Sequence, residues 1–271
     1  MSAARPWFAA IAFIALAVAL AFLVIPIVAV FTNTSPGGLV SALGEHGARE
    51  ALWLSLRTSL AAVAVIVLVG TPAAYLLGTR AFRGRALVLT LIELPLVMPP
   101  AAAGIALLAA FGPNGILGGA IHDAGIELVF ETAGVIVALV FVAAPFYLRA
   151  GVAAFAALDP SSLEASRTLG AGPGRTFLRV AIPEASGGLG AGLALAWGRA
   201  LGEFGATLMF AGSFPGVTRT ASLEIFATFN TPNGFTAALA LSGVLVAVSG
   251  ALLLAVKLVA GERALDEGRG T

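Results

Sequence analysis

Residues 158–183 read LDPSSLEASRTLGAGPGRTFLRVAIP and lie between two long apolar stretches of the chain. Asp159 can cap a helix that starts at Pro160, and Glu164 falls in the first turn, where the helix dipole favours an acidic residue. Gly170 can adopt the left-handed conformation that ends a helix. The pattern predicts a short helix, a break and a second short helix between two apolar segments.

The composition places this polar stretch in a membrane protein. The chain has 271 residues, of which 59% are hydrophobic and 11% charged. Soluble domains carry about 25% charged residues, and a soluble fold of this size could not hide so much apolar surface. Disordered chains are polar, so disorder is excluded as well. The net charge of +1 gives no indication of nucleic-acid binding, and with no cysteine and two histidines we expect neither a metal nor a cofactor.

Six stretches are apolar enough to cross a bilayer, which takes about 20 mostly apolar residues. They are residues 7–31, 55–78, 87–111, 132–154, 185–211 and 235–259. None alternates with a period of two, so helices are expected rather than a barrel. The first stretch exceeds the apolar core of a signal peptide, about 7–15 residues, so we expect it to be retained. The sequence predicts an all-α integral membrane protein with six transmembrane helices in a single domain, residues 1–271.

The loop charges predict the orientation. Basic residues gather after the second stretch, in the loop 155–183 and near both ends: Arg80, Arg83, Arg85, Arg167, Arg175, Arg179, Arg5, Lys257, Arg263 and Arg269. Basic residues accumulate in cytoplasmic loops, so we expect both termini and the loop 155–183 to be cytoplasmic. His46 and His122 then fall in outer loops, which argues against an intramembrane serine protease. The outer loop 112–131 starts with a turn signal and either lies on the surface or dips back into the membrane.

Six spans with short loops are typical of a transporter or channel. A phosphate-binding loop needs a lysine in the pattern G-x-x-x-x-G-K-[ST], and the one lysine, Lys257, lies outside any such pattern. We therefore expect no enzymatic activity, and ATP hydrolysis, where used, must come from another polypeptide. An ion-gradient-driven carrier stays an alternative, but it would show inverted repeats and acids in several spans. We find no repeat, and Glu93 and Glu203 are the only obvious deep acids.

The opening stretch resembles the permease subunits of bacterial ABC importers. Their pattern E-A-A-x-x-x-G, nine residues, I-x-L-P is matched by Glu164-Ala165-Ser166, by Gly170 and by residues 180–183, with Ser166 in place of an alanine. The resemblance implies a type I ABC importer permease architecture whose cytoplasmic loop docks on a separate ATPase. The residues it assigns to that contact are Glu164, Ala165, Ser166, Gly170, Ile182 and Pro183. It also implies a homodimer, two ATPase copies and an extracytoplasmic binding protein.

The fifth stretch carries two charges at membrane depth. Arg199 and Glu203 lie four residues apart and can pair on one helix face. A charge in a bilayer costs at least about 2.5–3.5 kcal/mol, so both should face the bundle interior or a wet cavity. A functional pair and a structural pair remain equally open. The same stretch has glycines four apart, a spacing that lets helices approach closely: Gly188 with Gly192, and Gly198 with Gly202.

Residues 199–212, RALGEFGATLMFAG, are similar to the fifth span of molybdate and tungstate permeases, and more loosely to that of sulfate permeases. With Pro95, Pro99 and Pro100 of the third stretch, the resemblance covers about residues 52–259. It implies import of molybdate or tungstate across the bacterial cytoplasmic membrane, with sulfate or thiosulfate as the alternative cargo. The sequence offers no evident cage of donors for a dianion. Our candidates for the pathway or gate are the broken third stretch and Arg199, Gly202, Glu203, Phe204, Gly205 and Thr207.

Overall fold

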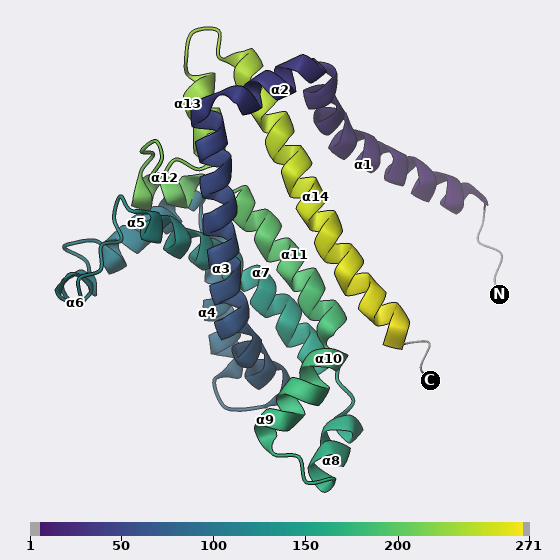
Figure 1. Ribbon diagram of the computed structural model, residues 1–271. Coiled ribbons are helices and arrows are strands. Elements are labelled where there is room, and N and C mark those ends of the chain that lie inside the picture. The colour runs from purple at the N-terminus through teal and green to yellow at the C-terminus, as the bar shows by residue number, and fades with distance from the viewer. Residues whose placement is uncertain (1–5, 268–271) are drawn as a thin grey trace.

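In a computed structural model of the chain, residues 6–267 are described, and all of its regular elements in that range are helices. Arg5 and Arg269, used above for orientation, lie outside this range. Figure 1 shows the arrangement. The elements are α1 (Pro6–Thr32), α2 (Pro36–Gly44), α3 (His46–Thr79), α4 (Arg85–Val97), α5 (Pro100–Phe111), α6 (Gly118–Asp123), α7 (Thr132–Ala156), α8 (Pro160–Thr168), α9 (Pro173–Thr176), the π-helix η1 (Phe177–Ala181), α10 (Ile182–Glu184), α11 (Ser186–Leu201), α12 (Gly205–Ala211), α13 (Ala221–Phe229) and α14 (Phe235–Glu267).

Four of these helices are long and apolar enough to cross a membrane on their own: α1, α3, α7 and α14. They confirm the predicted helices at 7–31, 55–78, 132–154 and 235–259. A fifth is added when the bent pair α4 and α5 is taken as one span. In lipid the backbone must satisfy its own hydrogen bonds, so an uninterrupted apolar run becomes a helix.

The third predicted span, 87–111, is not one helix. α4 and α5 meet at an angle of 118° across Met98 and Pro99. Each proline forces the residue before it out of helical conformation, and Met98 and Pro99 have extended ψ angles of 133° and 138°. Pro100 then begins α5, where its missing N–H would be unpaired in any case. The break that the prolines predicted in this stretch is therefore confirmed, and the structure adds its angle.

The fifth predicted span, 185–211, is also interrupted. α11 ends at Leu201 and α12 begins at Gly205. Phe204 lies between them with φ −132° and ψ −56°, which is not helical. The carboxylate of Glu203 accepts a hydrogen bond from the backbone N–H of Ala206, and this bond starts the new helix. A side chain that captures a backbone donor in this way competes with helix continuation.

The core is built around α7, which packs between α3 and α11 (Figure 1). Small residues allow the close contact of α7 with α11: a Cβ added at Gly188 or Gly192 would lie 2.5 Å or 2.8 Å from the Cβ atoms of Ala154 or Ala150. The packing role expected for this glycine pair is confirmed. At Gly198 and Gly202 an added Cβ would lie 3.6 Å and 3.7 Å from its nearest neighbours, so within the protomer these two glycines do not give a close approach of that kind.

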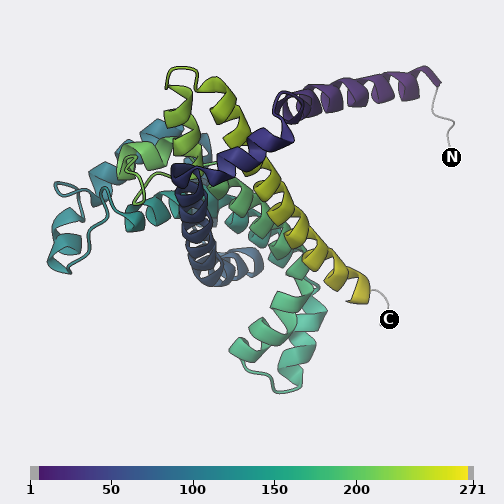
Figure 2. The same ribbon diagram turned by 45° about the horizontal axis from the view of Figure 1, so that its top comes forward.

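Two parts of the chain extend away from this bundle (Figure 2). α1 projects to one side, and none of its most apolar window is buried. The segment α8–α10 projects at the end where α3 and α7 terminate. The turn expected at the start of the loop 112–131 is confirmed, because Gly115 N donates to Gly112 O at 2.7 Å, and the short α6 follows it.

Candidate functional site

The α8 segment folds as its sequence predicts. Ser161 donates to Asp159 through its backbone N–H at 2.9 Å and its hydroxyl at 2.7 Å, and these two hydrogen bonds hold the pKa of the Asp159 carboxyl below its usual value. Pro160 occupies the first helical position, and Gly170 has the left-handed φ of +80°. The placement of Glu164 in the first turn was wrong. With Asp159 as the cap, Glu164 lies in the second turn, beyond the reach of the helix dipole.

Ser166 links the two halves of this segment. Its hydroxyl lies 2.9 Å from the hydroxyl of Thr176 in α9, and Thr176 is fully buried. An alanine at 166 could not make this bond, so the departure from the family pattern has a structural role here. Glu164, Ala165 and Gly170 stay exposed and present a surface to solvent.

An aromatic cluster joins the segment to the membrane helices. The ring of Phe177 in η1 lies 4.9 Å from that of Tyr75 in α3 and 6.4 Å from that of Phe155 in α7. Tyr75 and Phe155 are themselves 5.3 Å apart, edge to face. Ile182 packs against the same core, whereas Pro183 is exposed in α10, and the helix is interrupted at Ala185 rather than at Pro183. The sequence reasoning missed this cluster, although its three aromatic residues all lie near predicted helix ends.

The two interrupted spans meet each other inside the bundle. A Cβ at Gly205 in α12 would lie 2.6 Å from Pro100 Cβ in α5, and one at Gly104 would lie 2.7 Å from Ala206 O. The backbones of α5 and α12 therefore cross without room for a side chain. Irregular backbone at membrane depth is tolerated only where protein or a water-filled cavity surrounds it.

Arg199 and Glu203 lie at this crossing and pair as predicted. Arg199 Nη2 is 2.5 Å from Glu203 Oε2, while Oε1 accepts from Ala206 N at 2.7 Å. The Glu203 side chain is 1% exposed, whereas that of Arg199 is 28% exposed. Arg199 lines a cavity of about 170 Å³ whose other walls come from both halves of the broken span and from α7: Pro95, Leu96, Met98, Pro100, Ala103, Val142 and Phe146.

The other candidates surround this pair unevenly. Gly202 is exposed, and Phe204 contacts Phe226 of α13 with ring centroids 5.1 Å apart. Thr207 is fully buried, and its hydroxyl has no hydrogen-bond partner within residues 6–267. The structure thus groups Arg199, Gly202, Glu203, Phe204 and Gly205 at the break, with Thr207 inside α12.

A second ion pair, which lies within the stretches predicted to span the membrane, was missed from the sequence. Arg149 Nε in α7 lies 3.8 Å from Glu93 Oε1 in α4, and the two side chains are 71% and 46% exposed. The sequence indicates Glu93 as a deep acid but does not indicate Arg149 as its partner. The available signal was a single arginine inside the apolar stretch 132–154.

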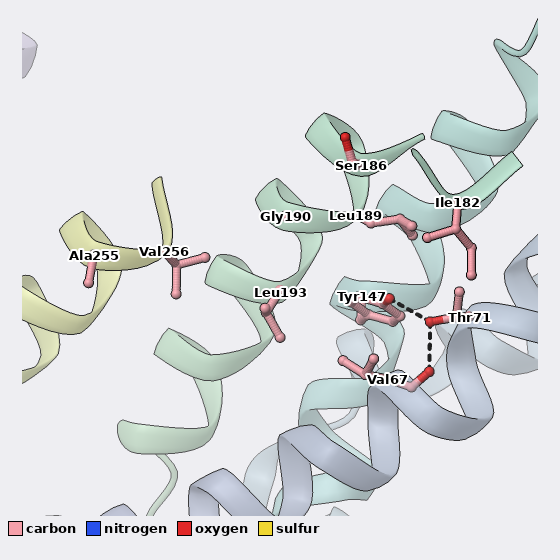
Figure 3. A pocket seen from close by; sticks show the side chains of 10 residues that line it. All are labelled: Val67, Thr71, Tyr147, Ile182, Ser186, Leu189, Gly190, Leu193, Ala255 and Val256. Atoms are coloured by element: carbon pink, nitrogen blue, oxygen red, sulfur yellow. Dashed lines mark hydrogen bonds between the residues drawn. The ribbon is translucent and has the colours of Figure 1, made fainter. Parts of the chain in front are cut away.

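A pocket of about 460 Å³ is lined mainly by apolar side chains (Figure 3). It lies among α3, α7, α11 and α14, and Figure 3 shows Leu193 and Val256 on facing helices. Thr71 donates to Val67 O at 2.6 Å, so the 2.7 Å contact between the hydroxyls of Tyr147 and Thr71 has Tyr147 as the donor. No charged side chain lines this pocket, which makes it unsuitable for a small anion.

The long apolar helices, the two broken helices and the exposed helical segment are the features expected of the membrane component of a transport system. The chain belongs to the family of binding-protein-dependent transport system inner membrane components, whose model matches residues 70–260. It is 41% identical over 239 residues to the molybdenum transport system permease protein ModB of Mycobacterium tuberculosis, covering 87% of this chain and 88% of that protein. It is 33% identical to the sulfate transport system permease protein CysW of Synechocystis sp., covering 89% and 88%.

Solved structures support the same fold. A bacterial ABC transporter involved in the import of the acidic polysaccharide alginate has a chain that superposes with a TM-score of 0.74 at 15% identity, covering 95% of this chain and 96% of that one. The family membership confirms a multi-pass inner membrane permease subunit that works with a binding protein and an ATPase. It also confirms that the chain is not itself the ATPase.

Proposed function

We propose that the chain is the membrane subunit of an ATP-driven importer of molybdate or tungstate. The observation that carries this proposal is the 41% identity to a molybdenum permease over most of both chains, against 33% to a sulfate permease. Import of sulfate or thiosulfate is the second candidate, because that resemblance also spans most of the chain. An ion-gradient-driven carrier fits the family poorly, since the family depends on a binding protein.

The proposed architecture has six spans, with α4–α5 as the third and α11–α12 as the fifth. Both termini and the α8–α10 segment are cytoplasmic, in line with the basic loops. Two copies of the chain form a homodimer with the pathway on its axis, dock two ATPase subunits and receive one loaded binding protein. Two-fold pairing is the commonest symmetry of homo-oligomers.

The proposed coupling surface is the exposed side of α8–α10. Glu164, Ala165 and Gly170 contact the ATPase, while Ser166 keeps α8 and α9 together through Thr176. Ile182 and Pro183 complete the assigned set, at the junction with the core. Because the rings of Tyr75, Phe155 and Phe177 pack this segment onto α3 and α7, a push on α8 moves both membrane helices as one body.

The proposed pathway passes the meeting point of the two interrupted spans. Arg199 opens into the cavity there and Gly202 is exposed, which supports a lining role for both. Phe204 borders the break beside α13 and is the candidate gate side chain. Glu203, Gly205 and Thr207 are packed inside the protomer, and we assign them the task of holding Arg199 and the break in place.

Reconstitution tests the cargo. The chain is expressed with its ATPase and binding protein, placed in liposomes, and ATP hydrolysis is measured with molybdate, tungstate or sulfate loaded on the binding protein. We expect stimulation by molybdate or tungstate at low concentration and none by sulfate. Stimulation by sulfate alone would support an ATP-driven importer of sulfate instead of molybdate. A chain that binds no ATPase would overturn the importer assignment.

A charge reversal tests the coupling surface. Glu164→Arg should abolish co-purification of the ATPase and ATP-driven uptake, because it inverts the charge of an exposed contact residue. Glu45→Arg is the matched control, since Glu45 is also exposed but precedes α3 at the opposite end of that helix. Unchanged uptake in the Glu164 variant would show that α8 does not make the contact.

A further inference from the structure

Two charged side chains lie exposed on the face of the protomer that α4 and α7 form. Arg149 lies seven residues before the end of α7 and Glu93 eight residues after the start of α4. At 1.5 Å per residue these positions are about 10 Å and 12 Å from the respective helix ends. The hydrocarbon core of a bilayer is about 30 Å thick, so both residues lie within it once the helix ends reach its surface.

The exposure of this pair argues against a lipid-facing position. The side chains are 71% and 46% exposed, and α4 has no buried residue in the protomer. Ionisable residues inside a membrane almost always face a bundle interior or a water-filled cavity, because lipid cannot solvate them. The α4–α7 face that carries Glu93 and Arg149 is therefore expected to face a second protein chain or a water-filled pathway rather than lipid.

The position of the pair along this face connects it to Arg199. Two residues that line the cavity of Arg199 are close to the pair in sequence. Phe146 precedes Arg149 by three residues on α7, and Pro95 follows Glu93 by two residues on α4. Arg149 thus lies one helical turn from the cavity, toward the α8 end of the bundle. An anion that leaves Arg199 in that direction meets Arg149 next.

The two arginines differ in what they can offer an anion. Arg199 is bound at 2.5 Å by a buried carboxylate that is fixed by a backbone hydrogen bond. Arg149 touches its carboxylate at 3.8 Å only, and no hydrogen bond of its guanidinium to another group of residues 6–267 is found. A guanidinium has five N–H donors in a planar fork that matches the oxygens of a tetrahedral oxyanion.

We propose that Arg149 is a weak oxyanion-binding site on the pathway, with Glu93 as a competing counter-ion that promotes release. This inference deepens the proposed function and rests on it for the class of cargo, a tetrahedral dianion. A conduction site must bind strongly enough to admit the ion and weakly enough to let it leave. A loosely held carboxylate beside the guanidinium supplies that balance, since it replaces the departing anion.

The first test measures uptake of isotopically labelled molybdate by the reconstituted complex, together with stimulated ATP hydrolysis. Arg149→Gln should lower the uptake rate about tenfold, the effect of losing one charge-assisted hydrogen bond. Stimulated ATP hydrolysis should persist, because docking and coupling lie elsewhere. Arg149→Lys should recover part of the uptake, and Arg83→Gln, a loss of charge in the α3–α4 turn, should leave both activities unchanged. Wild-type uptake in Arg149→Gln would overturn the site.

Glu93→Gln provides a second variant that leaves the arginine in place. Without the competing carboxylate, the anion should be held longer. Molybdate added on the α8 side should then inhibit uptake at about a tenfold lower concentration than in the wild type. An unchanged inhibition curve would show that Glu93 does not compete with the anion. This result can be obtained even if the Arg149 variants fail to assemble.

Because the chain has no cysteine, a single cysteine reports on water access directly. Arg149→Cys should react with a charged methanethiosulfonate reagent, be protected by molybdate, and regain uptake with the cationic reagent but not with a neutral one of similar size. Absence of reaction in the assembled complex would place the residue in lipid or protein and refute the site. If the wild-type complex responds to sulfate alone, the cargo assignment fails, while the Arg149 series repeated with sulfate still tests this site.

Discussion

The two ion pairs at membrane depth differ in almost every physical property. Glu203 is 1% exposed and bound both to Arg199 and to a backbone N–H, whereas Glu93 is 46% exposed and lies 3.8 Å from its arginine. The first carboxylate has a fixed place in the architecture because it accepts a hydrogen bond from Ala206 N in the first turn of α12 as well as neutralising a charge. The second is free to exchange partners. The comparison teaches that the role of a charged residue in a span depends on the other contacts of its counter-ion: a carboxylate that also binds the backbone is structural, and one without such a contact can exchange partners.

The largest effect is expected from removing the buried carboxylate. Glu203→Ala leaves Arg199 without a counter-ion and Ala206 N without an acceptor, and breaking a buried pair costs about 3–5 kcal/mol. Thermal unfolding in detergent, followed by size-exclusion fluorescence, should show much less folded protein. Glu93→Ala should change stability by no more than about 1 kcal/mol. Equal losses in both variants would remove the distinction between the two pairs.

The helix crossing beneath the tight pair can be disturbed without touching a charge. Gly205→Ala places a Cβ 2.6 Å from that of Pro100, and overpacking of this kind costs about 1–3 kcal/mol. The same melting assay should show the loss. Gly198→Ala is the matched control, because its nearest neighbour would be 3.6 Å away and alanine is the better helix former by about 1 kcal/mol. A stable Gly205 variant would mean that α5 and α12 can separate freely.

A charge swap sharpens the comparison on the other side. The double variant Arg149→Glu with Glu93→Arg keeps an exposed ion pair, whose contribution to stability is about 0–1 kcal/mol in either orientation. The melting temperature should be unchanged. Oxyanion uptake should fall as in Arg149→Gln, because the guanidinium now projects from α4. Full uptake by the swapped protein would mark this pair as structural, like that of Arg199.

The smallest effect concerns a third carboxylate, Asp159, which is in contact with water. Hydrogen bonds from Ser161 lower its pKa in the folded state, so the stability it contributes to α8 is present above its unfolded pKa of about 3.9. That contribution is lost as the pH falls through the lowered folded value. The protection factors of the α8 amides, which correct for the pH dependence of exchange itself, should therefore fall only under acid conditions, and Ser161→Ala should shift the onset of that fall to higher pH. If the onset did not move, the hydrogen bonds from Ser161 would not be the cause of the acid sensitivity of α8.

The sequence predicted what depends on composition and local pattern. Uninterrupted apolar runs predicted α1, α3, α7 and α14, and the Asp159 cap and Gly170 stop predicted the ends of α8. The pairing of Arg199 with Glu203 followed from helical spacing, although the helix ends at Leu201 before it reaches the glutamate. Each of these features is determined by residues that are close together in the sequence.

What the sequence could not predict depends on contacts between distant segments. The prolines at 99 and 100 indicated a break but not a bend of 118°, because the angle is set by the packing of α5 against α12. The break at 202–204 includes a carboxylate, Glu203, that accepts a hydrogen bond from the backbone N–H three residues later. Arg149 was overlooked because its partner belongs to another helix 56 residues earlier in the chain.

The splayed position of α1 bears on how the protein reaches its membrane. Its most apolar window has a mean hydropathy of 3.1 and none of it is buried against later helices of the same chain, so lipid can solvate it without them. It precedes α3, α7 and α11 in the chain and therefore emerges from the ribosome before them. α1 can enter the bilayer during synthesis without waiting for any later helix, and so anchors the nascent chain while the core assembles beside it. Polar substitutions along α1 should delay membrane integration more than they loosen the finished fold.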